Sequence, residues 1–135
     1  IDLLEKLDKI QSSEDVFKRW IPEMEATFKE NIEKKFQELL GENYDQQRVM
    51  AEVASLLVKY TISEEVVRLQ SHIDALKSEI ERNPAPGRKI DFICQEMNRE
   101  INTIGSKNQF LEVGQAVIEA KDALENIREQ AKNVE

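Results

Sequence analysis

Apolar residues recur every three or four positions along most of the chain, which is the spacing of amphipathic helices. The first run stops at the polar stretch 11–13, where Ser13 is expected to cap a second helix. The next run ends at Leu40, and Gly41 is expected to close that helix. Another run covers 49–60 with apolar residues on one face. The first half of the chain is therefore predicted to be helical.

The second half has the more regular pattern. From Ser63, an expected N-cap, apolar residues alternate spacings of three and four, which is typical of a coiled-coil seam. The prolines of segment 83–87 are expected to end this helix, because proline cannot continue the hydrogen-bond ladder. A fifth helix is expected to stop at Gly105, and a last one covers 113–134. Three such helices joined by short breaks predict an antiparallel bundle.

Composition agrees with this fold class. With 4 glycines and 3 prolines among 135 residues, the chain has too few turn residues for a β-sandwich or a β-barrel. We therefore expect an all-α protein, an antiparallel helical bundle with long coiled-coil-like helices. The 1 Cys excludes a disulfide framework and a thiolate zinc site, and the 1 His excludes a cage of several histidines.

The charge distribution limits the kinds of partner that the chain is expected to bind. The formal net charge is -8, and an acidic surface repels nucleic-acid phosphates unless its basic residues are clustered. Segment 86–110 carries 4 basic and 3 acidic residues, so its net charge is +1 in an otherwise acidic chain. No apolar run approaches the length of a membrane span and no signal peptide is predicted. We therefore expect a cytoplasmic location and no membrane partner.

Polar residues flank the seams of two neighbouring predicted helices. Glu96 and Glu100 stand one turn apart, so their carboxylates repel unless a cation, an arginine or a divalent metal, relieves them. A comparable stripe on the preceding helix consists of Glu65, Arg68, His72 and Glu79. The two stripes line one groove if the hairpin closes through its seams. The alternative is that both are solvated helix flanks held by ordinary salt bridges.

The sequence around these residues carries a specific motif. The run from 87 to 107, GRKIDFICQEMNREINTIGSK, resembles the signature of the YicC/YloC family of bacterial endoribonucleases. The run from 62 to 72, ISEEVVRLQSH, is similar to the family's second motif, and 118–135 is similar to its C-terminal helix. Cys94 and Asn108 depart from the pattern at uncharged positions, and Cys94 is interpreted as a small core residue rather than a nucleophile.

The resemblance also suggests a domain organisation. It covers residues 45–135 well and residues 1–44 only in general character. We therefore expect 1–44 to be a helical arm or linker from an N-terminal domain and 45–135 to be a helical C-terminal domain. The chain begins at Ile1 rather than at a methionine, which we interpret as a sign of a longer protein.

The resemblance implies cleavage of RNA that depends on a divalent cation, Mg²⁺ or Mn²⁺, within a ring-like homo-oligomer, a hexamer. On this hypothesis the metal ligands come from Glu65, Asp91, Glu96 and Glu100. The candidate catalytic residues are His72, Glu96 and Glu100. The candidate RNA-phosphate ligands are Arg68, Arg88, Arg99 and Lys107. No small-molecule cofactor is expected.

An alternative hypothesis assigns the chain no chemistry. It would then be a non-catalytic helical module for oligomerisation and RNA clamping, whose polar stripes maintain the assembly. Self-association is expected through the seam of 113–134, where Ala120 and Ala131 are small enough for close helix approach. The other possibility for that helix is packing only within its own subunit.

Overall fold

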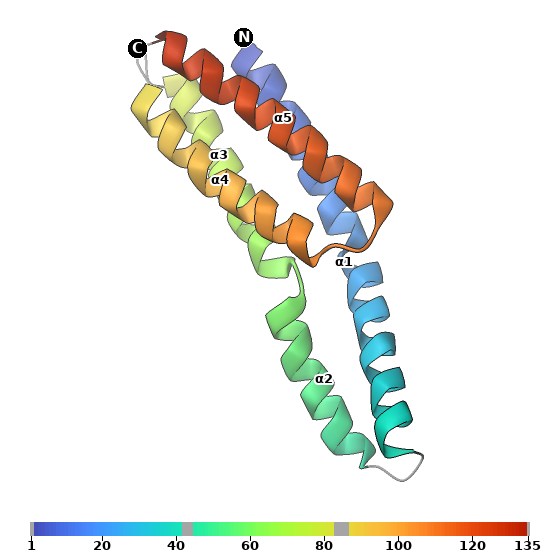
Figure 1. The fold of residues 1–135 in the computed structure, drawn as a ribbon. Helices are drawn as coiled ribbons and strands as arrows, with labels where there is room; N and C mark the ends of the chain where they lie inside the picture. Colours follow the sequence, from blue (N-terminus) through green and yellow to red (C-terminus); the bar gives the residue numbers. More distant parts are fainter. Residues whose placement is uncertain (1, 42–44, 83–86, 135) are drawn as a thin grey trace. The chain divides into compact units, whose positions relative to one another are not determined.

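The structure, a computed structural model, describes residues 2–41, 45–82 and 87–134. The regular secondary structure among them is helical: α1 (Asp2–Leu40), α2 (Gln46–Tyr60), α3 (Ser63–Arg82), α4 (Gly87–Lys107) and α5 (Leu111–Val134) (Figure 1). The all-α prediction is confirmed, and the helices pack as a helical bundle. The predicted proline break falls mainly on 83–86, which lies outside the described residues, as do the side chains of 58–60 and 133–134.

The chain divides into two compact units. One comprises Ile1–Arg19 and Ile62–Glu135, and the other comprises Trp20–Thr61. The division falls within α1 just before Pro22, a residue that has no amide hydrogen to donate to the preceding helical turn. The structural division therefore does not follow a boundary at residue 44. The origin of residues 1–44 in a further domain stays a prediction.

The first unit is built around α4, which packs against α3 and against α5 (Figure 1). Because short connections join these helices in order, neighbours run antiparallel, as the sequence predicts. The buried seam residues are Val66, Leu69, Ile73 and Leu76 of α3, Ile90, Met97, Ile101 and Ile104 of α4, and Val113, Val117, Ala120, Leu124, Ile127 and Ala131 of α5. The α5 seam is thus covered within its own chain. Packing within the subunit, the other possibility named for this helix, is what the structure shows, and self-association of the chain stays a prediction.

The polar stretch expected to break the first helix lies inside α1, which is continuous. Ser13 is buried there and does not act as a cap. Glu14 is buried as well, and its Oε1 lies 2.9 Å from Lys18 Nζ. Gln11 exchanges two hydrogen bonds, of 2.9 and 3.0 Å, with Gln70 of α3. The prediction failed because Gln11 faces α3 and bonds to Gln70, which the pattern of one helix does not reveal. Ser13 Oγ is buried and makes no hydrogen bond among the described residues.

The sequence predicts that Gly41, Ser63 and Gly105 begin or end helices, and one of these three predictions is confirmed. Gly41 closes α1 with φ +73°, and its N–H donates to the Gln37 carbonyl at 2.9 Å. Ser63, however, is the first residue of α3 rather than its cap. Gly105 does not stop α4, which continues to Lys107. The extra residues matter because they keep Lys107 on the helix beside α3.

Candidate functional site

The polar stripes of α3 and α4 meet along one side of their hairpin. Arg68 Nε donates to both carboxylate oxygens of Glu100, at 3.1 and 2.9 Å. Lys107 Nζ lies 3.1 Å from Glu65 Oε1. The Arg68 Nη2 atom is 3.5 Å from the same Glu65 oxygen, and Nη1 is 3.5 Å from Glu64 Oε2. Glu65, Arg68, Glu100 and Lys107 are called the α3–α4 ion cluster below.

Burial differs sharply between the acids and the arginine of this cluster. Glu65 and Glu100 are each 5% exposed, whereas the Arg68 side chain is 50% exposed. Buried carboxylates require charged or hydrogen-bonding partners, because water no longer stabilises them. The hydrogen bond and the charge of Glu100 raise the pKa of Arg68 above its ordinary value. The cluster therefore presents a firmly protonated, half-exposed guanidinium over two buried acids.

One acceptor of the cluster has no donor among the described residues. Glu65 Oε2 is buried and makes no hydrogen bond, while Oε1 receives both cations. Buried polar atoms of folded proteins are almost always hydrogen-bonded. An unsatisfied one costs about 1–3 kcal/mol. Glu65 Oε2 is thus an open acceptor position next to two positive charges.

The other candidate carboxylates lie apart from the cluster. Glu96 Oε2 has Arg99 Nη1 of its own helix at 3.9 Å. Asp91 Oδ1 accepts a hydrogen bond of 3.2 Å from Arg128 Nε of α5. Glu100 turns to the arginine of α3 instead of sharing a cation with Glu96. The four acids among which the metal ligands were expected therefore have three different sets of partners.

This arrangement bears on the expected metal. Within the described residues, no group of three or more His, Cys, Asp or Glu side chains is placed to hold a metal ion. The two acids that do come together, Glu65 and Glu100, already contact Arg68 and Lys107. A resident divalent cation does not fit this donor set. The sequence predicts either an arginine or a divalent metal beside Glu100. The structure has an arginine there, Arg68.

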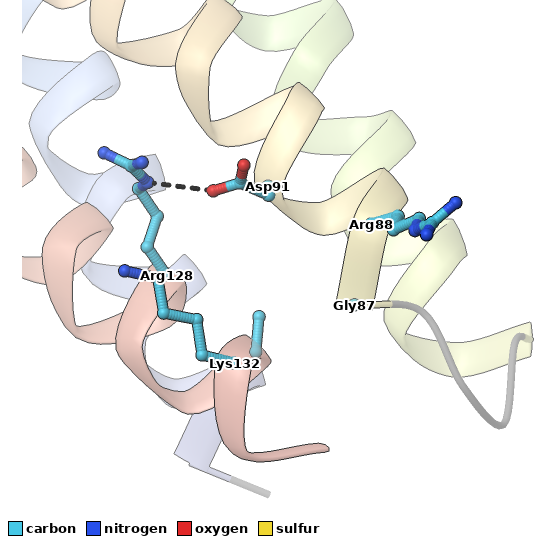
Figure 2. A pocket seen from close by; sticks show the side chains of 6 residues that line it. Gly87, Arg88, Asp91, Arg128 and Lys132 are labelled. Carbon is cyan, nitrogen blue, oxygen red and sulfur yellow. Dashed lines mark hydrogen bonds and ion pairs between the residues drawn. The ribbon is translucent and has the colours of Figure 1, made fainter. Parts of the chain in front are cut away.

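A second charged site lies where α4 begins and α5 ends. Its cavity of about 310 Å³ is lined by Gly87, Arg88, Asp91, Arg128, Ala131 and Lys132. Figure 2 shows Asp91 and Arg128 pointing toward one another from the two helices, while Arg88 points away from α5. The charge of Arg128 is therefore paired, and Arg88 does not converge with it on a common point.

Sequence reasoning assigned His72 and missed two partners of the assigned residues. His72 is half-buried on α3, one turn beyond Arg68 and on the same side of the helix. Glu64 contacts Arg68 at i, i+4, a spacing that signals an ion pair from sequence alone. Arg128 contacts Asp91 across α4 and α5, so its role depends on how these helices align.

The two departures from the family pattern are structural. Cys94 is fully buried, and burial raises the pKa of its thiol to about 12, which confirms its interpretation as a core residue. The Asn108 side chain accepts a hydrogen bond of 2.8 Å from the Phe110 N–H and donates one of 2.9 Å to the Phe110 carbonyl. This turn fixes the chain directly after Lys107, at the end of the α3–α4 ion cluster.

Comparison with known proteins agrees with the motifs. The family model described as "Endoribonuclease YicC-like, C-terminal" matches residues 17–135. A protein of Clostridioides difficile (strain 630) named "Probable endoribonuclease YicC" is 38% identical over 136 residues, which cover 99% of this chain and 46% of the relative. A protein of the same name from Haemophilus influenzae is 33% identical over 131 residues, which cover 97% of this chain and 45% of the relative.

These matches cover nearly all of the chain, which in turn spans less than half the length of the curated relatives. The matched region includes α2 to α5 and most of α1. It therefore contains every residue of the α3–α4 ion cluster. The chain belongs to the YicC-like endoribonuclease family and corresponds to its C-terminal region.

Proposed function

We propose that the protein containing this chain is an endoribonuclease and that the α3–α4 ion cluster is where this chain contacts RNA. The observation that carries the proposal is the family match over residues 17–135, together with relatives named probable endoribonucleases. The cluster adds suitable chemistry, because an arginine and a lysine are the side chains that most often bind RNA phosphates. Arg68 is half-exposed and therefore reachable by a polymer.

The geometry refines the roles proposed for individual residues. Arg68 and Lys107 would bind phosphate, and the exposed Arg88 and Arg99 would extend that contact along α4. Glu100 contacts Arg68 through two hydrogen bonds, so the role best supported for it is to orient that guanidinium toward RNA. His72 and Glu96 stay proposed catalytic residues, His72 as a group that moves a proton at its imidazole.

Dependence on Mg²⁺ or Mn²⁺ is a separate part of the proposal. The described side chains do not gather three ligands, so no ligand set is assigned to Glu65, Asp91, Glu96 and Glu100 together. An ion acting here would need phosphate oxygens of RNA or groups outside the described residues to complete its coordination. Cleavage by the full-length protein that EDTA abolishes and Mn²⁺ restores would support this part.

The proposed surroundings of the enzyme are a homo-oligomeric ring, a hexamer, in the cytoplasm. The buried α5 seam leaves other surfaces for assembly, and Leu111 and Ile118 are exposed apolar residues two turns apart on α5. None of the helices within the described residues combines the length and the apolar character that crossing a membrane requires.

A non-catalytic assembly and RNA-clamp module is the second candidate function. It is favoured by the paired state of the acids, since Arg68 and Lys107 tie α3 to α4 as a structural ion network would. Under this candidate the chemistry lies in the remainder of the full-length protein. The two functions differ in what removal of the charge at Glu100 does to the cleavage rate.

Cleavage of single-stranded RNA by the full-length protein tests the proposal. Glu100→Gln keeps the size of the side chain and removes its charge, and it should slow cleavage by a factor on the order of a hundred. Glu96→Gln is the second variant, and Glu119→Gln on the exposed side of α5 is the matched control, expected to cleave at the wild-type rate. Wild-type cleavage by both Glu96→Gln and Glu100→Gln would reject the site and favour the assembly module.

A further inference from the structure

The open acceptor at Glu65 points to a specific part of the RNA. We propose that Glu65 Oε2 accepts a hydrogen bond from a ribose 2′-hydroxyl, while Arg68 and Lys107 hold the neighbouring phosphate. Glu65 is then the residue by which this region distinguishes RNA from DNA, a role different from that of a metal ligand. The inference rests on the proposed function, because it requires RNA at the α3–α4 ion cluster.

The chemistry of the position restricts what binds there. An ionised carboxylate oxygen accepts hydrogen bonds and donates none, so the ligand must supply a donor to Oε2. Oε1 of the same carboxylate already has Lys107 Nζ at 3.1 Å and Arg68 Nη2 at 3.5 Å. Arg68 and Lys107 are paired with carboxylates, but the two Nη atoms of Arg68 are held only by contacts of 3.5 Å and can offer their donors to a negative group of the ligand. The fitting ligand therefore carries a donor beside an anion.

A ribose with its 3′-phosphate has this combination. The 2′-hydroxyl is both a donor and an acceptor, and it is the group that lets a protein distinguish RNA from DNA. It is attached to the carbon next to the one that carries the phosphate, so both groups reach one small site together. Deoxyribose offers the same phosphate without the donor, which would leave Glu65 Oε2 unsatisfied.

The contacts of Arg68 allow such a ligand to enter. Its bonds to Glu64 and Glu65 are both 3.5 Å, at the long end for hydrogen bonds, while its Nε bonds to Glu100 are 3.1 and 2.9 Å. The two Nη atoms can therefore turn toward a phosphate while Nε stays on Glu100. Arg68 contacts Oε1 of Glu65, so this movement leaves Oε1 with Lys107, and rotation of the carboxylate can then bring Oε2 to the side that the half-exposed arginine occupied.

The local fold holds Glu65 in place for this role. Glu65 lies in the first turn of α3, where the helix N-terminus stabilises negative charge. The buried neighbours Val66 and Leu69 fix that turn against the core. An acceptor held on a packed helix loses little conformational freedom when a ligand binds.

Binding measurements on the full-length protein test the inference. Fluorescence anisotropy in EDTA, which limits cleavage, compares three single strands of one sequence: RNA, 2′-O-methyl RNA and DNA. Wild type should bind RNA about tenfold more tightly than either of the others, the scale of one hydrogen bond to a charged group. Glu65→Ala should reduce that preference to within about twofold, because the 2′-hydroxyl contact is lost. The substitution also removes the Oε1 contacts with Arg68 and Lys107, which affects RNA and DNA alike, so the ratio of the two affinities is the readout.

Glu64→Ala is the matched control, because Glu64 also contacts Arg68 but is exposed and has no open buried oxygen. It should keep the RNA preference. If Glu65→Ala does not fold, the wild-type comparison decides: equal affinity for RNA and 2′-O-methyl RNA overturns the inference. A preference that persists in folded Glu65→Ala also overturns it, and wild-type RNA cleavage in the same preparation leaves the proposed function intact. Failure of wild type to bind any strand removes both proposals.

Discussion

Two charged sites on α4, nine residues apart, show how burial changes the meaning of the same residue types. At the α3–α4 ion cluster, the Glu100 side chain is 7% exposed and pairs with Arg68 at 2.9 Å. At the cavity end, the Asp91 side chain is 42% exposed and pairs with Arg128 at 3.2 Å. Water stabilises the second pair and not the acid of the first. Only at the cluster does a missing partner indicate a ligand.

The flanking residues explain this difference. Glu100 lies among the buried residues Met97, Ile101 and Ile104 of its own helix, against the packed face of α3. Asp91 lies near the start of α4 beside an open cavity. The carboxylate of Glu100 therefore serves packing or ligand binding, whereas the carboxylate of Asp91 is mainly solvated.

Replacing the arginine of each site by alanine should give the largest difference in stability between the two sites. Arg68→Ala leaves Glu100 without its cation and Glu65 with Lys107 alone, so the free energy of unfolding should fall by about 2–3 kcal/mol, reduced from the fully buried case because Arg68 is half-exposed. Arg128→Ala should cost less than about 1 kcal/mol, with an effect that shrinks as salt rises. Urea denaturation of both variants measures this, and equal losses would contradict the burial argument.

Cys94 lies on α4 between the two sites. The pH dependence of stability that its thiol causes tests how tightly the core between the sites is packed. Burial raises the pKa of its thiol from 9.0 to about 12, so the folded state keeps a proton that the unfolded state releases above pH 9. The contribution of Cys94 to stability is therefore complete below pH 9. It should decline by about 1.4 kcal/mol per pH unit from there toward pH 12.

Cys94→Ala lacks this titration, so the stability difference between wild type and variant should narrow as the pH is raised from 8 to 10.5. Denaturation curves at matched pH values measure that difference, and the other titrating groups cancel in it. A difference that stays constant over this range would show that the thiol titrates normally and that the core around it admits water.

Much of the first unit follows from the sequence, including the pairing of α3 with α4. Arg68 and Glu100 each stand sixteen positions from 84, which lies within the predicted turn, and Glu79 and Lys89 each stand five positions from it. An antiparallel hairpin brings equidistant residues together, and both pairs are in contact, at 2.9 and 3.9 Å. Periodicity and the turn therefore predict which stripes meet.

The sequence could not predict which partner each side chain chooses. The spacing of Glu96 and Glu100 places both acids on one face of α4, but Glu100 reaches across to α3 and Glu96 stays with Arg99. Burial decided this choice, because the acid nearer the core needs the stronger partner. The prediction of a helix break around Ser13 failed for a related reason, since Gln11 of that stretch bonds to Gln70 of another helix.

The most direct test of the central claim is RNA affinity across a salt series for two lysine variants of the full-length protein. Lys107 belongs to the α3–α4 ion cluster and Lys132 lines the cavity at the other end. We predict that Lys107→Gln weakens binding of a single-stranded RNA about tenfold and lowers the slope of log Kd against log salt by about one, whereas Lys132→Gln stays within about twofold of wild type. Equal losses in the two variants, or a larger loss for Lys132→Gln, would contradict the assignment of RNA binding to the cluster.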